Sequence, residues 1–240
     1  EQAERFGLEV HDKNVERVEL SSRPFGVWVE GEEYRAESLI ICTGAEAIWL
    51  GAEGEEAQKG RGISTCATCD GAFFRDEEII VVGGGDSAME EATFLTRFAS
   101  KVTIIHRRDV FRASKVMYER AETHPKIDIK SFRIVKEWLA DENGLSGALL
   151  EDPRDGSTEE INCTGAFIAI GHKPITSFLD NQLETDSEGY LVHKENTMTS
   201  MPGVFAAGDV VDKRYRQAIT AAGMGCQAAI DAERWLEDQE

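Results

Sequence analysis

Two cysteines separated by two residues, Cys66 and Cys69, lie shortly before a glycine-rich stretch at 83–85. Cysteines at this spacing can form a small disulfide ring that opens and closes by thiol–disulfide exchange. Asp70 follows the pair directly and can give or take the proton that this exchange needs. If the pair opens a helix, the helix dipole favours a thiolate. Together with a nucleotide loop, the pair indicates electrons passing from a nicotinamide to a disulfide.

Two other readings of the cysteine pair are open. A zinc knuckle needs four ligands at finger-like spacing, but the other cysteines, Cys42, Cys163 and Cys226, have no close partner in the sequence. Two reduced core thiols are disfavoured by polar neighbours such as Thr68. We therefore expect a redox pair and no bound metal.

The glycine-rich stretch fits the pattern G-x-G-x-x-A between an expected strand and an expected helix. Its residues are Gly83, Gly85, Asp86, Ser87 and Ala88. The first glycine permits a tight turn and the second lets the backbone approach a pyrophosphate, while the alanine lets the helix pack on the strand. The strand–turn–helix context predicts a dinucleotide site.

A basic cluster follows the next expected strand and distinguishes between the two nicotinamide cofactors. It consists of His106, Arg107, Arg108 and Arg112. An NAD site places Asp or Glu at this position, where the carboxylate accepts a hydrogen bond from the ribose 2′-hydroxyl. Guanidinium groups instead suit the 2′-phosphate of NADP(H). The cluster therefore predicts NADP(H); the alternative is a solvated basic patch on an acidic protein.

Composition narrows the class of protein. The 240 residues carry a net charge of -19, which argues against nucleic-acid binding. This acidity fits either solubility or adaptation to high salt. No apolar run reaches the length of a membrane span. Five cysteines, three of them isolated, indicate a reducing, cytoplasmic location. The chain opens at Glu1 in mid-pattern, so we expect a preceding segment.

The order of expected elements predicts an α/β fold with a parallel, doubly wound sheet. Residues 1–7 resemble a helix end, and 15–20, 26–29 and 34–36 a meander, followed by a strand at 37–43. A crossing between domains is expected at 51–62 and a second at 171–174. Between them we expect strands at 79–82, 102–105, 127–129, 132–138 and 167–170, helices at 87–98 and 111–121, and a hairpin of 145–150 with 158–162. A strand at 204–207 and a helix at 217–236 follow.

Several motifs together resemble the low-molecular-weight thioredoxin reductases of bacteria and plants. They are Cys66-Ala67-Thr68-Cys69-Asp70-Gly71, the glycine loop continued to Ala92, His106-Arg107-Arg108 with Phe111-Arg112-Ala113, the stretch 202–211, and the stretch 215–223. The resemblance covers essentially the whole chain in order. It implies a homodimeric flavoenzyme in which NADPH reduces FAD, FAD reduces the disulfide, and the dithiol reduces thioredoxin.

The resemblance also implies a role for each matching residue. Cys69 would be the thiol nearest the flavin, Cys66 the thiol that attacks thioredoxin, and Asp70 the general acid. Gly83, Gly85 and Ala88 would hold the NADPH pyrophosphate, and the basic cluster the adenosine phosphate. Asp209, with Gly208, would meet the FAD linker, and Arg216, Gln217 and Ala218 would line the isoalloxazine; Thr43 and Gly44 resemble a further FAD contact.

The implied architecture is two doubly wound Rossmann-like domains, with the NADPH domain (49–171) inserted into the FAD domain (1–48 and 172–240). Crossings near Leu50 and His172 would permit a hinge. The family carries a second glycine loop for FAD, which this sequence lacks, so we expect residues 1–240 to bind NADPH better than FAD. The alternatives are a truncated, non-enzymatic NADPH-binding module and the flavoprotein component of a peroxiredoxin reductase.

Overall fold

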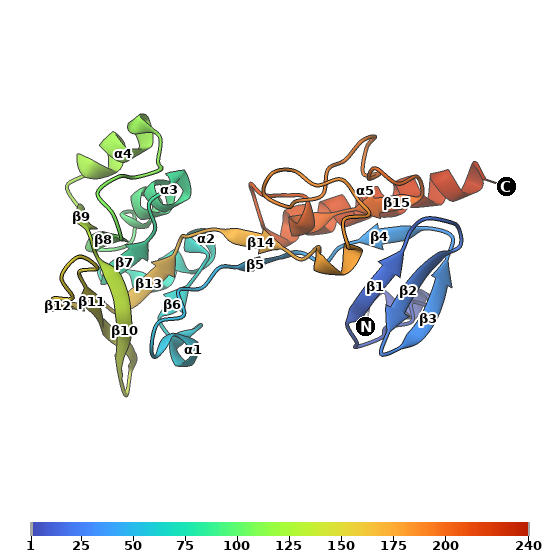
Figure 1. The fold of residues 1–240 in the computed structure, drawn as a ribbon. Helices are drawn as coiled ribbons and strands as arrows, with labels where there is room; N and C mark the ends of the chain where they lie inside the picture. The colour runs from blue at the N-terminus through green and yellow to red at the C-terminus, as the bar shows by residue number, and fades with distance from the viewer. Residues whose placement is uncertain (1, 240) are drawn as a thin grey trace. The chain divides into compact units, whose positions relative to one another are not determined.

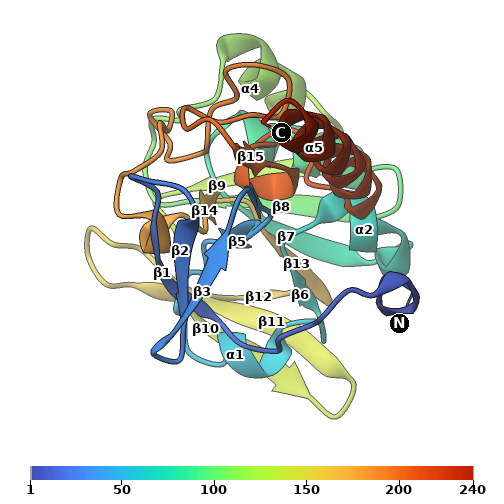
Figure 2. The same ribbon diagram turned by 90° about the vertical axis from the view of Figure 1, so that its right-hand side faces the viewer.

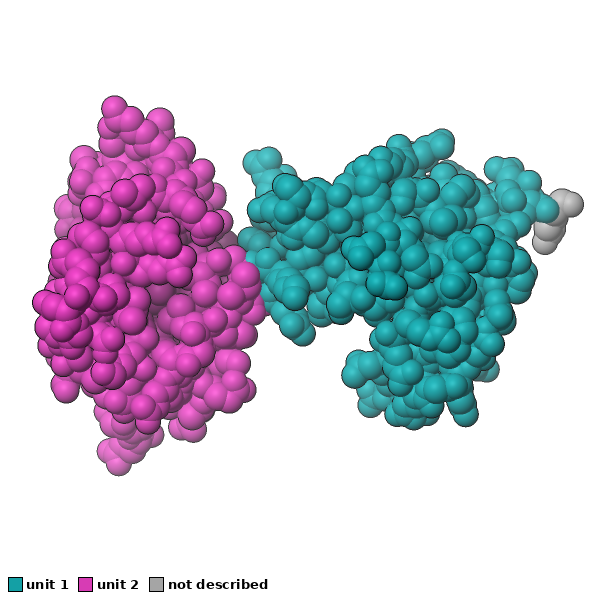
Figure 3. All heavy atoms as spheres, in the orientation of Figure 1, with its two compact units in different colours: residues 1–46, 172–240 teal, residues 47–171 magenta. Residues whose placement is uncertain are grey.

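The structure, a computed structural model, describes residues 2–239, which divide into two compact units (Figure 3). Unit 1 comprises the residues up to 46 together with those from 172 onward, and unit 2 comprises residues 47–171. The chain thus leaves unit 1 once and returns to it once. No helix within residues 2–239 is long and apolar enough to cross a membrane.

Unit 2 is built on a five-stranded parallel sheet in the order β6-β13-β7-β8-β9 (Figure 1). The strands are β6 (Ile63–Ser64), β7 (Glu78–Val82), β8 (Lys101–His106), β9 (Ile127–Ser131) and β13 (Gly165–Ile168). The central strands read as short apolar runs because both of their faces are covered. The parallel sheet predicted from the sequence is confirmed.

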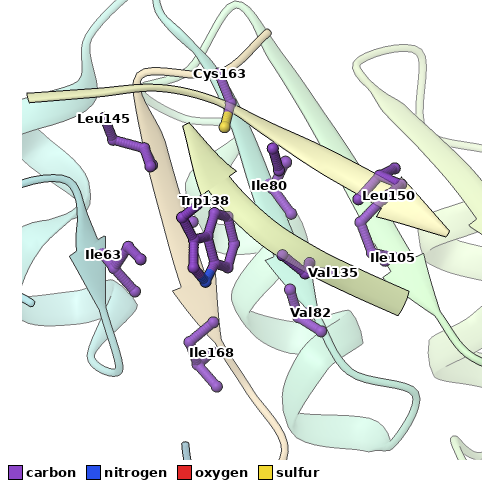
Figure 4. Close-up of a cluster of buried hydrophobic side chains, with 12 residues drawn as sticks. Ile63, Ile80, Val82, Ile105, Val135, Trp138, Leu145, Leu150, Cys163 and Ile168 are labelled. Carbon is purple, nitrogen blue, oxygen red and sulfur yellow. The ribbon is translucent and has the colours of Figure 1, made fainter. Parts of the chain in front are cut away.

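Helices cover one face of this sheet and a second sheet covers the other. Helices α3 (Asp86–Leu95) and α4 (Lys115–Glu122) lie on the first face, where Met89, Leu95 and Phe167 are completely buried. The antiparallel sheet of β10 (Ile134–Asp141), β11 (Gly144–Glu151) and β12 (Thr158–Asn162) lies on the second. Figure 4 shows Trp138 of β10 among apolar side chains of the parallel sheet.

The helix expected at 111–121 begins four residues later than predicted. The N–H groups of Arg112 and Ala113 donate to the carbonyl of Gly84 at 2.7 and 3.0 Å, and Ser114 N–H donates to Asp86 Oδ1 at 2.6 Å. These bonds hold residues 112–114 against the glycine loop, so α4 starts only at Lys115. The expectation of helix at 111–114 was therefore wrong.

The remaining short elements of unit 2 precede β7 in the chain. They are α1 (Glu55–Gln58), α2 (Ala67–Asp70) and the 3-10 turn Gly71–Phe74. Glu55 is buried, and its carboxylate accepts from the N–H groups of Leu50 and Gly51 at 3.2 and 2.7 Å. The stretch that enters unit 2 is thereby fixed to α1.

Unit 1 contains the expected meander, β1 (Val15–Glu19), β2 (Phe25–Val29) and β3 (Glu32–Ala36), visible in Figures 1 and 2. Strands β4 (Leu39–Ile41) and β15 (Val204–Ala206) pair in parallel, and α5 (Ala218–Glu237) packs on β15 through Phe205 and Ala228. Two shorter strands, β5 (Ala45–Ala47) and β14 (His172–Pro174), form a pair. The described part of this unit also contains the 3-10 turns Glu4–Phe6, Ser177–Leu179 and Gly208–Val210.

Candidate functional site

Cys66 and Cys69 are joined by a disulfide at the start of α2. Cys66 is the N-cap residue, and its Sγ accepts a hydrogen bond from the N–H of Cys69 at 3.2 Å. Thr68 Oγ1 lies 3.4 Å from the same sulfur. Hydrogen-bond donors at a sulfur atom favour its thiolate form, because they stabilise the developing negative charge. The turn is therefore suited to opening and closing a disulfide.

Asp70 closes this turn and is held by a residue that the sequence analysis missed. Ser64 Oγ donates to Asp70 Oδ2 at 2.6 Å and accepts from the N–H of Cys66 at 3.0 Å. Ser64 lies six residues before Asp70 in the sequence. This spacing indicates a contact only when the residues between them are known to form a tight turn. Ser64 thus joins the predicted acid to the predicted redox pair.

The segment 66–74, which carries the disulfide, packs against the helical face of unit 2. A Cβ on Gly71 would lie 2.8 Å from Leu95 Cδ2 of α3, so the absence of a side chain lets the turn approach that helix. Phe74 contacts Phe167 edge-on, with ring centroids 5.5 Å apart. Phe73, by contrast, is 80% exposed. An apolar ring thus lies on the surface four residues after Cys69.

The glycine loop connects β7 to α3 as the motif predicts. A Cβ on Gly83 would lie 2.5 Å from the carbonyl oxygen of Ala169 and 2.7 Å from the Cβ of Ala88, so this position has room only for glycine. Gly85 is the N-cap residue of α3, and a Cβ there would meet no atom within 4 Å. Open space at a helix N-terminus with exposed backbone is the geometry that accepts a phosphate. Ser87 lies in the first turn of this helix.

A pocket of about 530 Å³ extends from this loop. His106, Arg107, Arg108 and Arg112 line it together with Gly83 and Gly84; its other walls include Trp49, Leu50, Ile134 and Ile170. One part of the pocket is therefore basic and another apolar, as a nucleotide with phosphates and aromatic rings requires. The residues present fit NADPH.

His106 is packed tightly within the pocket. A Cβ on Gly84 would lie 2.3 Å from His106 Cε1, and the imidazole centroid is 4.4 Å from that of Phe111. Burial, with further contributions from the neighbouring arginines, lowers the pKa of His106 below its ordinary value. Burial and the three arginines thus both disfavour the charged form of this ring. Asp86 was also predicted to contact the nucleotide, but its Oδ1 already accepts a hydrogen bond from the N–H of Ser114.

Arg133 also lines the pocket and was not predicted. Its Nε donates to Glu159 at 2.5 Å and its Nη1 to Asp152 at 2.9 Å. It lies near the start of the strand expected at 132–138, and this position gave no signal that it would line the pocket. Groups of three or more side chains suited to a metal ion do not occur in residues 2–239.

The residues predicted to contact FAD all lie in unit 1. Oδ1 of Asp209 is buried without a hydrogen-bond partner in the described chain, and burial, together with the charge of Asp212, raises the pKa of Asp209. A buried carboxylate oxygen without a donor indicates a missing ligand group, and the hydroxyls of the FAD linker are donors of the required kind. The residues present therefore fit FAD at this position.

The other predicted FAD residues lie in three short stretches of unit 1, beginning with Gly208 next to Asp209. Gly208 has a φ of 77°, and Arg216, with a φ of 47°, contacts His172 Nδ1 through Nη1 at 2.8 Å. Gln217 caps α5 and Ala218 begins it. In the third stretch, Thr43 Oγ1 donates to the carbonyl of Ile175 at 2.7 Å and Gly44 has a φ of 73°.

Comparison with known proteins assigns the family. Residues 2–225 match the model of the pyridine nucleotide-disulphide oxidoreductases. The chain belongs to this family. Thioredoxin reductase of Mycolicibacterium smegmatis is 52% identical over all of the chain and 77% of its own length, and thioredoxin reductase 2 of Arabidopsis thaliana is 51% identical over 99% of the chain and 64% of its own. The solved thioredoxin reductase of Giardia duodenalis, 43% identical, matches 98% of the chain and 78% of its own with a TM-score of 0.92.

Within the family, the chain is a member of the low-molecular-weight thioredoxin reductases, as the motifs indicated. These enzymes use NADPH and FAD for disulfide reduction. The prediction of an NADPH-dependent flavoprotein disulfide reductase is confirmed, and the alternative of a non-enzymatic module is not favoured.

Proposed function

We propose that this chain carries two electrons from NADPH, by way of FAD, to the Cys66–Cys69 disulfide and from there to thioredoxin. The disulfide at the start of α2, with Ser64 and Asp70 beside it, is the observation that carries this assignment of residues. When bound, NADPH would supply a hydride and FAD would serve as the two-electron carrier between NADPH and a disulfide.

The pocket of unit 2 is the proposed NADPH site. Gly83, Gly85 and Ala88 form the pyrophosphate cradle with the N-terminus of α3, where Asp86 accepts a hydrogen bond from the N–H of Ser114. Arg107, Arg108 and Arg112 bind the 2′-phosphate, and His106 lines the same pocket beside them. The proposed FAD contacts are Asp209 with Gly208, the stretch 216–218, and Thr43 with Gly44.

In the proposed exchange, Cys66 attacks the disulfide of thioredoxin. The Cys66 thiolate forms a new S–S bond with one thioredoxin sulfur while the bond between the two thioredoxin sulfurs breaks, and the released thiolate takes a proton. Cys69 then attacks Cys66, which reforms the disulfide of this chain and releases the second thioredoxin sulfur, which also takes a proton. Asp70 is the proposed proton donor. The donors around Cys66 Sγ support its role as the attacking thiolate.

Three further features belong to this proposal. Exposed Phe73 supports the docking of a protein substrate beside the disulfide.

The exposed apolar side chains of Ile219 and Ile230 on α5 support a homodimer. The unpaired thiols of Cys42, Cys163 and Cys226 support a reducing, cytoplasmic location.

Trapping of the mixed disulfide tests the assignment. With NADPH, FAD and thioredoxin present, Cys66→Ser and Cys69→Ser should each abolish thioredoxin reduction, and only Cys69→Ser should accumulate a covalent complex with thioredoxin on a non-reducing gel. Cys226→Ser, an exposed cysteine in unit 1, serves as the control and should behave like the original chain. A covalent complex with Cys66→Ser instead would reverse the roles of the two cysteines.

A further inference from the structure

Ser64 makes two hydrogen bonds whose directions are fixed by chemistry. The N–H of Cys66 can only donate, so Ser64 Oγ accepts from it at 3.0 Å. The single hydroxyl proton of Ser64 is then available for Asp70 Oδ2, 2.6 Å away, a distance typical of a hydroxyl bound to a carboxylate. The hydroxyl therefore ties the carboxyl group of Asp70 to the backbone of Cys66.

The two ends of this link differ in how firmly they are held. Ser64 is the last residue of β6 and is in register with Phe167 of β13, while its neighbour Ile63 is completely buried. Asp70 ends a helix of only four residues, Ala67–Asp70, in which its N–H donates to the carbonyl of Cys66 at 3.1 Å. The hydrogen bond from Ser64 thus fixes the carboxyl group of Asp70, which lies on a short turn, relative to the parallel sheet.

We propose that Ser64 is a positioning residue for disulfide exchange, which acts by holding the carboxyl group of Asp70 where it can protonate a departing sulfur. This inference rests on the proposed role of Asp70. Each exchange turns the thiols of Cys66 and Cys69 into a disulfide and the thioredoxin disulfide into two thiols, so the two protons that the attacking thiols lose equal the two that the departing sulfurs gain. In the proposed relay, the Asp70 carboxylate takes a proton from an attacking thiol and then, as a carboxylic acid, gives it to the departing sulfur and becomes a carboxylate again. The donated hydrogen bond from Ser64 stabilises the carboxylate that results, so it favours the transfer.

A simpler role for Ser64 would be to shape the turn alone through its bond to Cys66, as serine does in many turns. The two roles make different demands on the rest of the site. If Ser64 only shapes the turn, its removal should impair exchange whether or not Asp70 is present. If it acts through Asp70, its removal should have no effect once the carboxylate is gone.

A single-turnover experiment without either cofactor separates these roles. The chain is reduced with dithiothreitol, desalted and mixed with oxidised thioredoxin; the reaction is quenched with iodoacetamide, and reduced thioredoxin is counted by mass spectrometry. Threonine and valine have the same shape and both suit a strand, so Ser64→Thr and Ser64→Val differ mainly in the hydroxyl. We expect Ser64→Val to slow the transfer about tenfold and Ser64→Thr to stay within about twofold of the original chain.

The double variants complete the test. Asp70→Asn should slow the transfer at least as much as Ser64→Val, and adding Ser64→Val to it should change the rate by less than about twofold. Thr65→Ala, which removes the neighbouring hydroxyl, should leave the rate unchanged. Equal rates for Ser64→Thr and Ser64→Val, or a full additional loss in the Asp70→Asn background, would overturn the inference. If the reduced original chain transfers no electrons to thioredoxin, the proposed function itself fails.

Discussion

At the level of single residues, the site combines groups that the sequence marks clearly with groups that it does not. Gly83 was predicted from its motif, and its hypothetical Cβ is blocked by the backbone of Ala169. Gly84 occupies a variable position of the same motif, yet the His106 ring lies where its side chain would be. A local sequence motif reveals the positions that a ligand or a tight turn restricts to glycine. It does not reveal a restriction imposed by a side chain more than twenty residues away.

Arg107 and Arg108 allow a direct test of cofactor choice. Both are exposed and line the pocket beside the glycine loop. Replacing both with alanine removes charged hydrogen bonds to a 2′-phosphate, so the Kd for NADPH should rise about tenfold or more. The Kd for NADH, which lacks this phosphate, should change by less than about twofold. Isothermal titration calorimetry measures both constants.

Arg120→Ala provides the control for this experiment, because Arg120 is an exposed arginine of α4 outside the pocket lining. It should alter neither constant. Equal weakening of NADPH and NADH by the double variant would mean that the two arginines do not distinguish the cofactors, and that the cluster is a solvated basic patch.

At the level of elements, the central strands of the parallel sheet were predicted because they are runs of buried apolar residues, whereas the short strands β5, β6 and β14 were not predicted. Ile79–Val82, for example, was predicted as a strand, and β7 spans Glu78–Val82. The start of α4 was not predicted, because Arg112 and Ala113 give their N–H groups to Gly84, a contact that only the folded chain creates. The hairpin of β11 and β12 was expected, but its place on the second face of the parallel sheet was not.

The turn between β11 and β12 depends on Asp152, a carboxylate with 4% of its side chain exposed. Hydrogen bonds from Arg154, aided by the charge of Arg133, hold the pKa of Asp152 well below its ordinary value of 3.8. A lowered pKa in the folded state means that the carboxylate stabilises the fold above pH 3.8 and that this contribution is lost as the pH falls below it. Asp152→Asn should therefore lower the unfolding temperature clearly at pH 7, and the difference should narrow progressively below pH 3.8.

Thermal unfolding followed by circular dichroism at several pH values checks this expectation. Glu160→Gln, on the exposed side of β12, is the matched control and should leave the unfolding temperature unchanged. A difference between Asp152→Asn and the original chain that stays constant down to the most acidic pH would show that the charge of Asp152 is not the source of its effect.

At the level of the whole molecule, the proposed NADPH site is confined to one unit. Every residue that lines the pocket falls between Trp49 and Ile170, inside residues 47–171. The ends of that unit are also adjacent, since the N–H of Ile48 donates to the carbonyl of Gly171 at 3.0 Å. A unit with its own cores and neighbouring ends meets the usual conditions for folding alone.

Residues 47–171, expressed alone, should therefore fold cooperatively and bind NADPH with a Kd within about threefold of that of the whole chain. Thermal unfolding tests the first expectation and calorimetry the second. Arg107→Ala with Arg108→Ala in the same fragment should again remove the preference for NADPH over NADH, which ties the binding to the pocket. A fragment that unfolds cooperatively but binds NADPH more than about tenfold more weakly would mean that unit 1 contributes to the nucleotide site, and that the pocket of unit 2 is not sufficient by itself.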